Sequence, residues 1–229
     1  MVNAAKAHSV VANMLKVAGV DHIITMDLHS SQMQGFFSYP SDNLLSEPGF
    51  TRYIRENFDT SNCVIVSKNA GGTKRVTSLA DRLNAEFAMI HRERYHIEQS
   101  QKQTDDDEGK IETRLTLVGD VKGKICFLID DIIDGTHSFL DACKHLKTCE
   151  ASRVIILAVH GILSGDGLKE IQECEDVDEV ITTNTYPMKE STKALSNKLT
   201  IMDISGVFAE AIRRTHNGES ISYLFHTAI

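Results

Sequence analysis

The sequence predicts an α/β protein in which a parallel sheet is covered by helices on both faces. Short runs of β-branched and apolar residues alternate with helical patterns along the chain. Most of these runs are almost continuously apolar, as is typical of parallel strands buried on both sides. In the clearest unit, the run Cys63–Ser67 precedes a helical pattern over Thr73–Leu83. The apolar residues of that pattern recur at helical spacing, at Val76, Leu79, Ala80 and Leu83.

Each remaining element is predicted from the same contrast of patterns. The predicted strands are His22–Met26, Cys63–Ser67, Phe87–His91, Leu115–Val118, Lys124–Ile129, Val154–His160, Glu179–Thr183, Leu199–Asp203 and Ile221–Phe225. Two further helices are expected at Ser138–Lys147 and Ser205–Arg214, and residues 1–19 read as an amphipathic helix rather than a signal peptide. The polar segment Tyr95–Arg114 carries an acidic run and is predicted to be a mobile loop or insertion.

Composition and charge disfavour three classes of protein: non-specific nucleic-acid binders, membrane-spanning proteins and disulfide-rich proteins. The chain of 229 residues has a formal net charge of −8, which disfavours non-specific nucleic-acid binding because that binding needs a basic surface. No apolar run reaches the roughly 18 residues that a membrane-spanning helix needs. The five cysteines are scattered without paired spacing, which favours a reducing compartment such as the cytoplasm over a disulfide framework.

The strongest candidate site is the run Cys126–Ser138, in which an apolar strand leads into two adjacent acids, Asp130 and Asp131. A turn rich in hydroxyl groups then opens a helix. Parallel sheets bind ligands at the carboxyl ends of their strands, and a helix N-terminus presents free backbone N–H groups to a phosphate. Phosphosugar binding is the favoured interpretation. The alternative is an ordinary strand end in which Asp134 or Ser138 caps the helix.

Two weaker candidates also follow strands. Asp27 and His29 could face the same way and hold Mg²⁺ or a nucleotide phosphate, although His is a poor Mg²⁺ ligand and a simple turn is favoured from the residues alone. The segment Ser67–Arg75 has paired glycines that allow a tight turn, followed by two cations in the first helical turn. An anion site and a solvated helix start are equally compatible with it.

Together these segments resemble the ribose-phosphate diphosphokinase family, whose members are also called phosphoribosyl-diphosphate (PRPP) synthases. The resemblance runs from about Val11 to Phe225. It rests on the strings VANMLKVAGVDHIITMDLH, QGFF, GGTKRVTSLADRLNAEFAMIH, LVGDVKGK, HGILSG, VITTNT and AEAIRRTHNGESISYLF. It implies a type I phosphoribosyltransferase-like fold and transfer of the β,γ-diphosphate of MgATP to ribose 5-phosphate, giving PRPP and AMP for nucleotide biosynthesis. It also implies homo- or hetero-oligomers with PRPP synthase subunits, with no nucleic-acid or membrane partner.

The resemblance assigns roles to individual residues. It implies a ribose-phosphate loop at Asp130, Asp131, Asp134, Gly135, Thr136, His137 and Ser138. It implies metal-associated residues at Asp27, His29 and Asp42, and a nucleotide-binding turn at Asn69, Gly71 and Gly72. It places the two cations of the mobile catalytic loop at Arg92 and Arg94, where they would stabilise charge on the transferring phosphoryl group.

The same resemblance implies an uneven domain content. Residues 1–57 match part of an N-terminal phosphoribosyltransferase-like domain, residues 58–211 match a complete C-terminal one with the insertion near 95–114, and residues 212–229 form a C-terminal segment. Several positions depart from the family pattern. His137 stands where a glycine is usual, Asn69 and Ser38 stand where acids are usual, and Arg92 replaces a lysine.

Two functions therefore stay open: a PRPP synthase subunit, which is the slightly favoured assignment, and a non-catalytic associated or regulatory subunit. The departures favour the second function, as does the turn DIID-x-x-x-SF, which looks like the associated proteins of the family. A salvage phosphoribosyltransferase would explain the acidic loop but not the strings NGESISYLF and HRER.

Overall fold

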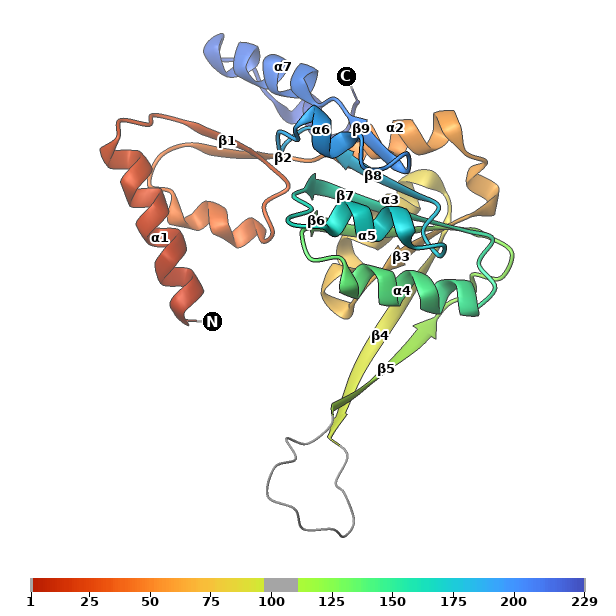
Figure 1. The fold of residues 1–229 in the computed structure, drawn as a ribbon. Coiled ribbons are helices and arrows are strands. Elements are labelled where there is room, and N and C mark those ends of the chain that lie inside the picture. Colours follow the sequence, from red (N-terminus) through yellow and green to blue (C-terminus); the bar gives the residue numbers. More distant parts are fainter. Residues whose placement is uncertain (1, 97–110, 229) are drawn as a thin grey trace, which may run out of the picture.

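The structure is a computed structural model that describes residues 2–96 and 111–228 (Figure 1). Its centre is a seven-stranded sheet of order β5-β4-β3-β6-β7-β8-β9, in which every neighbouring pair is parallel except β4 and β5. The strands are β3 (Cys63–Ser67), β4 (Glu86–His96), β5 (Ile111–Val118), β6 (Ile125–Ile133), β7 (Arg153–Gly161), β8 (Glu179–Thr183) and β9 (Leu199–Met202). The strand that carries the two adjacent acids, β6, is therefore the middle strand.

A second, smaller sheet stands to one side of the large one in Figure 1. It pairs β1 (Ile23–Met26) with β2 (Ser41–Leu44) in parallel, and the connection contains a 3₁₀ helix at Ser31–Phe36. Helix α1 (Val2–Val17) precedes it and lies beside that connection. This part corresponds to the partial domain that the sequence predicts.

Helices cover both faces of the large sheet, which confirms the predicted architecture. The remaining helices are α2 (Glu47–Asn57), α3 (Thr73–Leu83), α4 (His137–Thr148), α5 (Gly167–Glu173), α6 (Glu190–Lys193) and α7 (Ser205–His216). Short 3₁₀ helices lie at Thr60–Asn62, Ala70–Gly72 and Ser222–Phe225. One buried cluster joins β6 to α4 and α5, and the other joins it to α2 and α3. From Cys126 to Ile129, successive side chains of β6 alternate between the two clusters, as a strand requires.

Two predicted segments are corrected by the structure. The predicted strand Ile221–Phe225 is wrong, because Ser222–Phe225 forms a 3₁₀ helix in which only Leu224 is buried. The predicted loop Tyr95–Arg114 is wrong at both ends, since β4 continues to His96 and β5 begins at Ile111. Antiparallel backbone pairing extends both strands, and residues 97–110 lie outside the described part of the chain.

The end of β6 differs from the prediction, and two elements lie across the predicted domain limits. The strand continues past the acids to Ile133, because Ile132 and Ile133 still pair with the long strand β7. Helix α2 falls within the predicted N-terminal part, yet Phe50 and Ile54 belong to a core cluster of the large sheet. The predicted limit at residues 211/212 falls inside α7. The domain limits themselves stay a prediction.

The cysteines and helices bear on the predicted environment of the protein. Cys63 and Cys126 are free and buried, and burial raises the pKa of the Cys63 thiol to about 11. Both thiols therefore behave as small hydrophobic groups, as the sequence indicates. Among the helices that the structure describes, none has the length and apolar character that crossing a membrane would take.

Candidate functional site

The two acids of β6 point to opposite faces of the sheet. Phe127 and Ile129 pack on the face of α2 and α3, so Asp131 continues that side, whereas Asp130 faces α4. The backbone N–H of Asp131 donates to the Asp130 carboxylate at 3.0 Å. The pair therefore presents one carboxylate to each side of the strand end.

Asp131 joins the small sheet to the large one. Its Oδ2 lies 2.5 Å from Nδ1 of His29, and its Oδ1 lies 3.9 Å from a guanidinium nitrogen of Arg75. The Asp131 side chain is only 6% exposed, whereas that of His29 is 83% exposed. Burial by itself would raise the pKa of Asp131. Hydrogen bonding with His29 and with Asp130, together with the charge of Arg75, outweighs burial and holds the pKa of Asp131 below its usual value.

Asp130 has a lysine partner that sequence reasoning did not single out. Lys68 Nζ lies 2.7 Å from Asp130 Oδ2, and both side chains are largely buried. The same ammonium group lies 3.4 Å from Ser138 Oγ and 3.6 Å from the centre of the Phe139 ring. Because Ser67 pairs with Ile129 in register, the residue after β3 must lie beside Asp130. The signal available in the sequence was a lysine directly after a strand that neighbours the acidic one.

The predicted phosphate turn is held by the loop that follows β7. Asp134 Oδ1 accepts the backbone N–H of Ser164 at 3.1 Å, and the hydrogen bonds from Ser164 lower the pKa of Asp134. Thr136 is buried, and its hydroxyl donates to a carboxylate oxygen of Glu170. Gly167 leaves room for this contact, since an added Cβ would lie 3.2 Å from Cγ2 of Thr136. A hollow of about 200 Å³ lies over the turn.

That hollow defines which predicted loop residues come together. Its lining residues are Asp134, Gly135, Thr136, His137, Ser164, Asp166, Gly167 and Glu170. His137 is the first residue of α4, and Thr136 occupies the N-cap position without a side-chain capping bond. The structure therefore brings the turn to a helix N-terminus as predicted, while neither Asp134 nor Ser138 is the N-cap. Glu170 and Ser164, which support the turn, were not anticipated.

The three predicted metal-associated residues are not brought together. Asp27 is buried in the left-handed backbone region at φ 44°, and its Oδ2 accepts the N–H of Ser46 at 2.7 Å. Oδ2 of Asp42 lies 2.7 Å from Nε2 of His22. His29 instead contacts Asp131. Within residues 2–96 and 111–228 no group of three or more His, Cys, Asp or Glu could hold a metal ion. These side chains do not fit a dedicated protein cage for Mg²⁺.

The turn after β3 is tight, as its glycines predicted. Asn69 Oδ1 accepts the N–H of Gly72 at 3.0 Å, so its amide oxygen closes the turn. A Cβ on Gly72 would lie 2.7 Å from Ser67 Oγ, which explains the need for glycine there. Gly71 is exposed beside Asn69. Arg75, in the first turn of the following helix, reaches toward Asp131.

The predicted catalytic cations lie on the strand pair β4–β5, which extends away from the body of the protein in Figure 1. A terminal guanidinium nitrogen of Arg92 lies 3.5 Å from Oδ2 of Asp141 in α4. Arg94 pairs through its backbone with Thr113, and its side chain lies outside the described part. The hairpin thus carries both residues on an arm that begins at the edge of the sheet next to β3.

Comparison with known proteins places this arrangement in a family. Residues 100–226 match the family model described as the phosphoribosyl synthetase-associated domain. The chain is 41% identical over 297 residues to ribose-phosphate pyrophosphokinase 1 of Schizosaccharomyces pombe, covering 95% of this chain and 73% of the relative. It superimposes on the crystal structure of phosphoribosylpyrophosphate synthetase from Mycobacterium smegmatis with a TM-score of 0.78 and 34% identity, covering 93% of this chain and 64% of that one.

The chain thus spans just under two thirds of the solved structure that it matches, in keeping with one complete domain and part of a second. The family resemblance predicted from the sequence is confirmed by these matches. The fold, the sequence identity and the matched family model agree, and the chain belongs to the ribose-phosphate pyrophosphokinase, or PRPP synthase, family.

Proposed function

We propose that this chain is a subunit of a cytoplasmic ribose-phosphate diphosphokinase that works in an oligomer with PRPP synthase subunits. The reaction transfers the diphosphate of ATP to ribose 5-phosphate, giving PRPP and AMP. The observation that carries the proposal is the end of β6, where Asp130, Asp131 and the turn into α4 follow one another at the carboxyl edge of the sheet in a member of this family. That edge of a parallel sheet is where such folds bind their ligands.

Each group at this edge has a chemical task in the proposed reaction. The carboxylates of Asp130 and Asp131 would accept hydrogen bonds from ribose hydroxyls, and the N-terminal amides of α4 with Ser138 would hold the 5-phosphate. The anomeric hydroxyl releases its proton to water as its oxygen attacks the β-phosphorus of ATP, the bond from that phosphorus to the oxygen that bridges to the α-phosphate breaks, and AMP leaves with that oxygen. Arg92 and Arg94 would stabilise the charge that develops during this transfer.

Magnesium enters this scheme with ATP, as part of the substrate. Mg²⁺ usually keeps several waters and is held by substrate phosphates with one or two carboxylates, so a complete protein cage is not required. Among the predicted metal-associated residues, His29 lies closest to the acids because it contacts Asp131. Asp27 would act indirectly, by fixing the loop that carries His29 through its bond to Ser46.

A second function, a non-catalytic associated subunit, is favoured by the partners of the acids. Lys68 pairs with Asp130, and Asp131 contacts His29 and lies 3.9 Å from a guanidinium nitrogen of Arg75, so both carboxylates are already engaged. The hydroxyl of Thr136 is likewise committed to Glu170. A sugar would have to displace these internal contacts before it could use the same groups. This second function predicts ligand binding or complex formation without turnover.

One assay separates the two functions. AMP release is measured with ribose 5-phosphate and MgATP, first on the purified chain and then after mixing with an intact PRPP synthase. Turnover by the chain alone, lost in Asp130→Asn but kept in Asp120→Asn, supports the first function. Asp120 is a suitable control because it is an exposed carboxylate with a lysine partner of its own.

The other outcomes are equally informative. No turnover alone, combined with a changed rate in the mixture, supports the associated-subunit function. If the chain neither turns over nor alters the synthase, and ribose 5-phosphate fails to bind it, both functions are wrong.

A further inference from the structure

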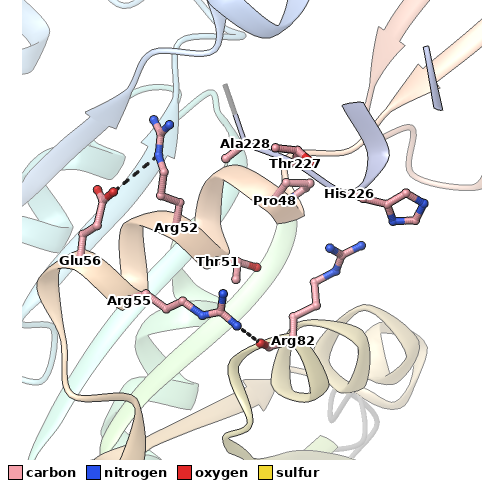
Figure 2. Close-up of a pocket in the computed structure, with 9 residues that line it drawn as sticks. All are labelled: Pro48, Thr51, Arg52, Arg55, Glu56, Arg82, His226, Thr227 and Ala228. Atoms are coloured by element: carbon pink, nitrogen blue, oxygen red, sulfur yellow. Dashed lines mark hydrogen bonds and ion pairs between the residues drawn. The ribbon is translucent and has the colours of Figure 1, made fainter. Parts of the chain in front are cut away.

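A second hollow lies away from the end of β6, where α2, the end of α3 and the C-terminal residues meet (Figure 2). Its volume is about 480 Å³. It is lined by Pro48, Thr51, Arg52, Arg55, Glu56, Arg82, His226, Thr227 and Ala228, and we call it the arginine pocket. None of these residues belongs to the candidate site described above. The candidate functional site therefore does not account for the residues that line this pocket.

Arg82 is held in a fixed orientation within this pocket. Its Nε contacts a carboxylate oxygen of Glu47, and a terminal nitrogen donates to the carbonyl oxygen of Phe225 at 3.1 Å. A guanidinium group has five N–H donors, so three remain for another partner. In Figure 2 the side chain of Arg82 extends between Arg55 and His226. The group is thus positioned in advance, which lowers the entropic cost of binding an anion.

Arg55 is a cation without a carboxylate partner among the described residues. One terminal nitrogen donates to the carbonyl oxygen of Arg82, at the end of α3. That contact leaves four of its five N–H donors available. Arg52, the third cation, has only a loose contact of 3.9 Å with Glu56 on the same helix. Positive charge therefore exceeds negative charge locally, although the whole chain carries a net charge of −8.

Helix capping accounts for part of this arrangement. Arg55 and Arg82 stand in the last turns of α2 and α3, where a cation interacts favourably with the helix dipole. Capping explains why each helix carries an arginine in its last turn. It does not explain why both guanidinium groups, with Arg52 and His226, line one hollow whose wall includes Pro48 and Ala228. A bound anion would balance this concentration of charge.

We propose that the arginine pocket binds the phosphate group of a phosphorylated small molecule. Planar guanidinium groups match phosphate oxygens in two-point hydrogen bonds, which lysines cannot reproduce. The volume falls in the range of about 300–1,000 Å³ typical of small-molecule sites, so it exceeds the needs of a bare phosphate ion. Pro48 and Ala228 offer apolar contact to the rest of the ligand.

The test uses His226 as a local reporter. Inorganic phosphate, ribose 5-phosphate, AMP and adenosine are titrated separately into the full chain while the imidazole resonances are followed by NMR. The His226 signal is assigned by its loss in His226→Gln. The proposal expects a saturable shift with the three phosphate-bearing probes and none with adenosine. Tighter binding of AMP or ribose 5-phosphate than of phosphate would show that the organic part also contributes.

Variants connect that shift to the arginines. Arg55→Gln should weaken binding at least tenfold, and Arg55→Lys should restore only part of the affinity because it keeps the charge but loses the planar fork. Arg153→Gln, which removes a half-buried cation on β7, should leave the titration unchanged. Ser138→Ala should also leave it unchanged, which separates this pocket from the phosphate turn. Should Arg55→Gln fail to fold, Arg52→Gln provides the second test.

Several results would overturn the proposal. A linear shift that chloride reproduces at equal ionic strength would mean screening only. A saturable shift that Arg55→Gln leaves unaltered would place the anion elsewhere, and the absence of any shift at His226 would leave helix capping as the whole role of these arginines.

Discussion

The carboxyl end of β6 and the arginine pocket balance their charges in different ways. At the end of β6, Asp130 and Asp131 each have an internal cation, Lys68 for one and Arg75 for the other, and Asp131 also contacts the imidazole of His29. In the arginine pocket the cations outnumber the acids, and among residues 2–96 and 111–228 the partner of Arg55 is a backbone carbonyl. The carboxylates at the end of β6 thus have charged partners within the protein, whereas the arginine pocket keeps an excess of positive charge that an anion would balance.

This difference predicts which substitutions change the stability of the folded chain and which change ligand binding. A group with an internal partner stabilises the folded chain, and a ligand must first compete with that partner. A group without one contributes little to folding and is free to bind. Changes at β6 should therefore alter stability most, and changes in the pocket should alter binding with little effect on stability.

The largest effect on stability is expected for Asp131→Asn. The change removes the charge that His29 and Arg75 contact, and it leaves the Arg75 guanidinium without this carboxylate. Hydrogen bonds to charged groups are worth about 1.5–3 kcal/mol, so we expect the free energy of unfolding to fall by about 2 kcal/mol. Denaturant unfolding of the wild type and variant measures it. Asp120→Asn, on an exposed carboxylate, is the control and should cause no measurable loss.

Acid should weaken the same contact. The pKa of Asp131 in the folded chain lies below its ordinary value of 3.8, so the unfolded chain takes up a proton first as the pH falls. The stabilisation is complete above the ordinary pKa and disappears as the pH drops through the folded-state value. Unfolding measured between neutral pH and pH values below that point should show a steeper acid loss in the wild type than in Asp131→Asn. Equal slopes would contradict the assigned role of Asp131.

A smaller effect is expected for Lys68→Ala. Removing the ammonium group frees the Asp130 carboxylate for one more hydrogen bond to the sugar, so ribose 5-phosphate should bind about fivefold more tightly, the factor that corresponds to a net hydrogen bond of about 1 kcal/mol. Calorimetric titration measures the affinity. Lys124→Ala is the matched control, because Lys124 is similarly buried and pairs with Glu86 on the opposite end of the sheet. Weaker binding in Lys68→Ala would mean that the lysine itself contacts the ligand.

The smallest effect is expected in the arginine pocket. Arg52→Gln removes a loose contact between two exposed side chains, and such pairs contribute about 0–1 kcal/mol. The free energy of unfolding should change by less than about 0.5 kcal/mol. Thermal and denaturant unfolding measure it. A large loss of unfolding free energy would show that the charges of the arginine pocket, like those at the end of β6, have partners within the protein.

Much of the large sheet could be predicted because its strands and helices repeat simple periods. The bounds of β3, β8 and α3 match the prediction residue for residue. Helix α2 was missed because Pro48 and Gly49 disguise its start, although proline is well tolerated in a first helical turn. Strand β2 was missed because Ser41–Leu44 is short and polar, and it is defined by pairing with β1.

The candidate site was predicted as a set of strand ends but not as a set of contacts. Asp130, Asp131 and the following turn stand at the expected edge, because chain order and apolar runs determine where strands end. The partners Lys68 and Glu170 could not be inferred, since each depends on which strand or loop lies alongside. The sequence also placed Asp42 with His29, whereas the register of β1 and β2 gives Asp42 to His22.

The 2.5 Å contact between His29 and Asp131 has a consequence for how the protein responds to ligands. It ties the loop after β1 to the middle strand of the other sheet, through an imidazole that is largely open to solvent. Under the proposed function, a ribose hydroxyl bound by Asp131 would compete with that tie, so occupancy of the strand end and the position of the small sheet would be thermodynamically coupled. By reciprocity, whatever neighbouring surface steadies the small sheet would change the affinity for the sugar by the same factor.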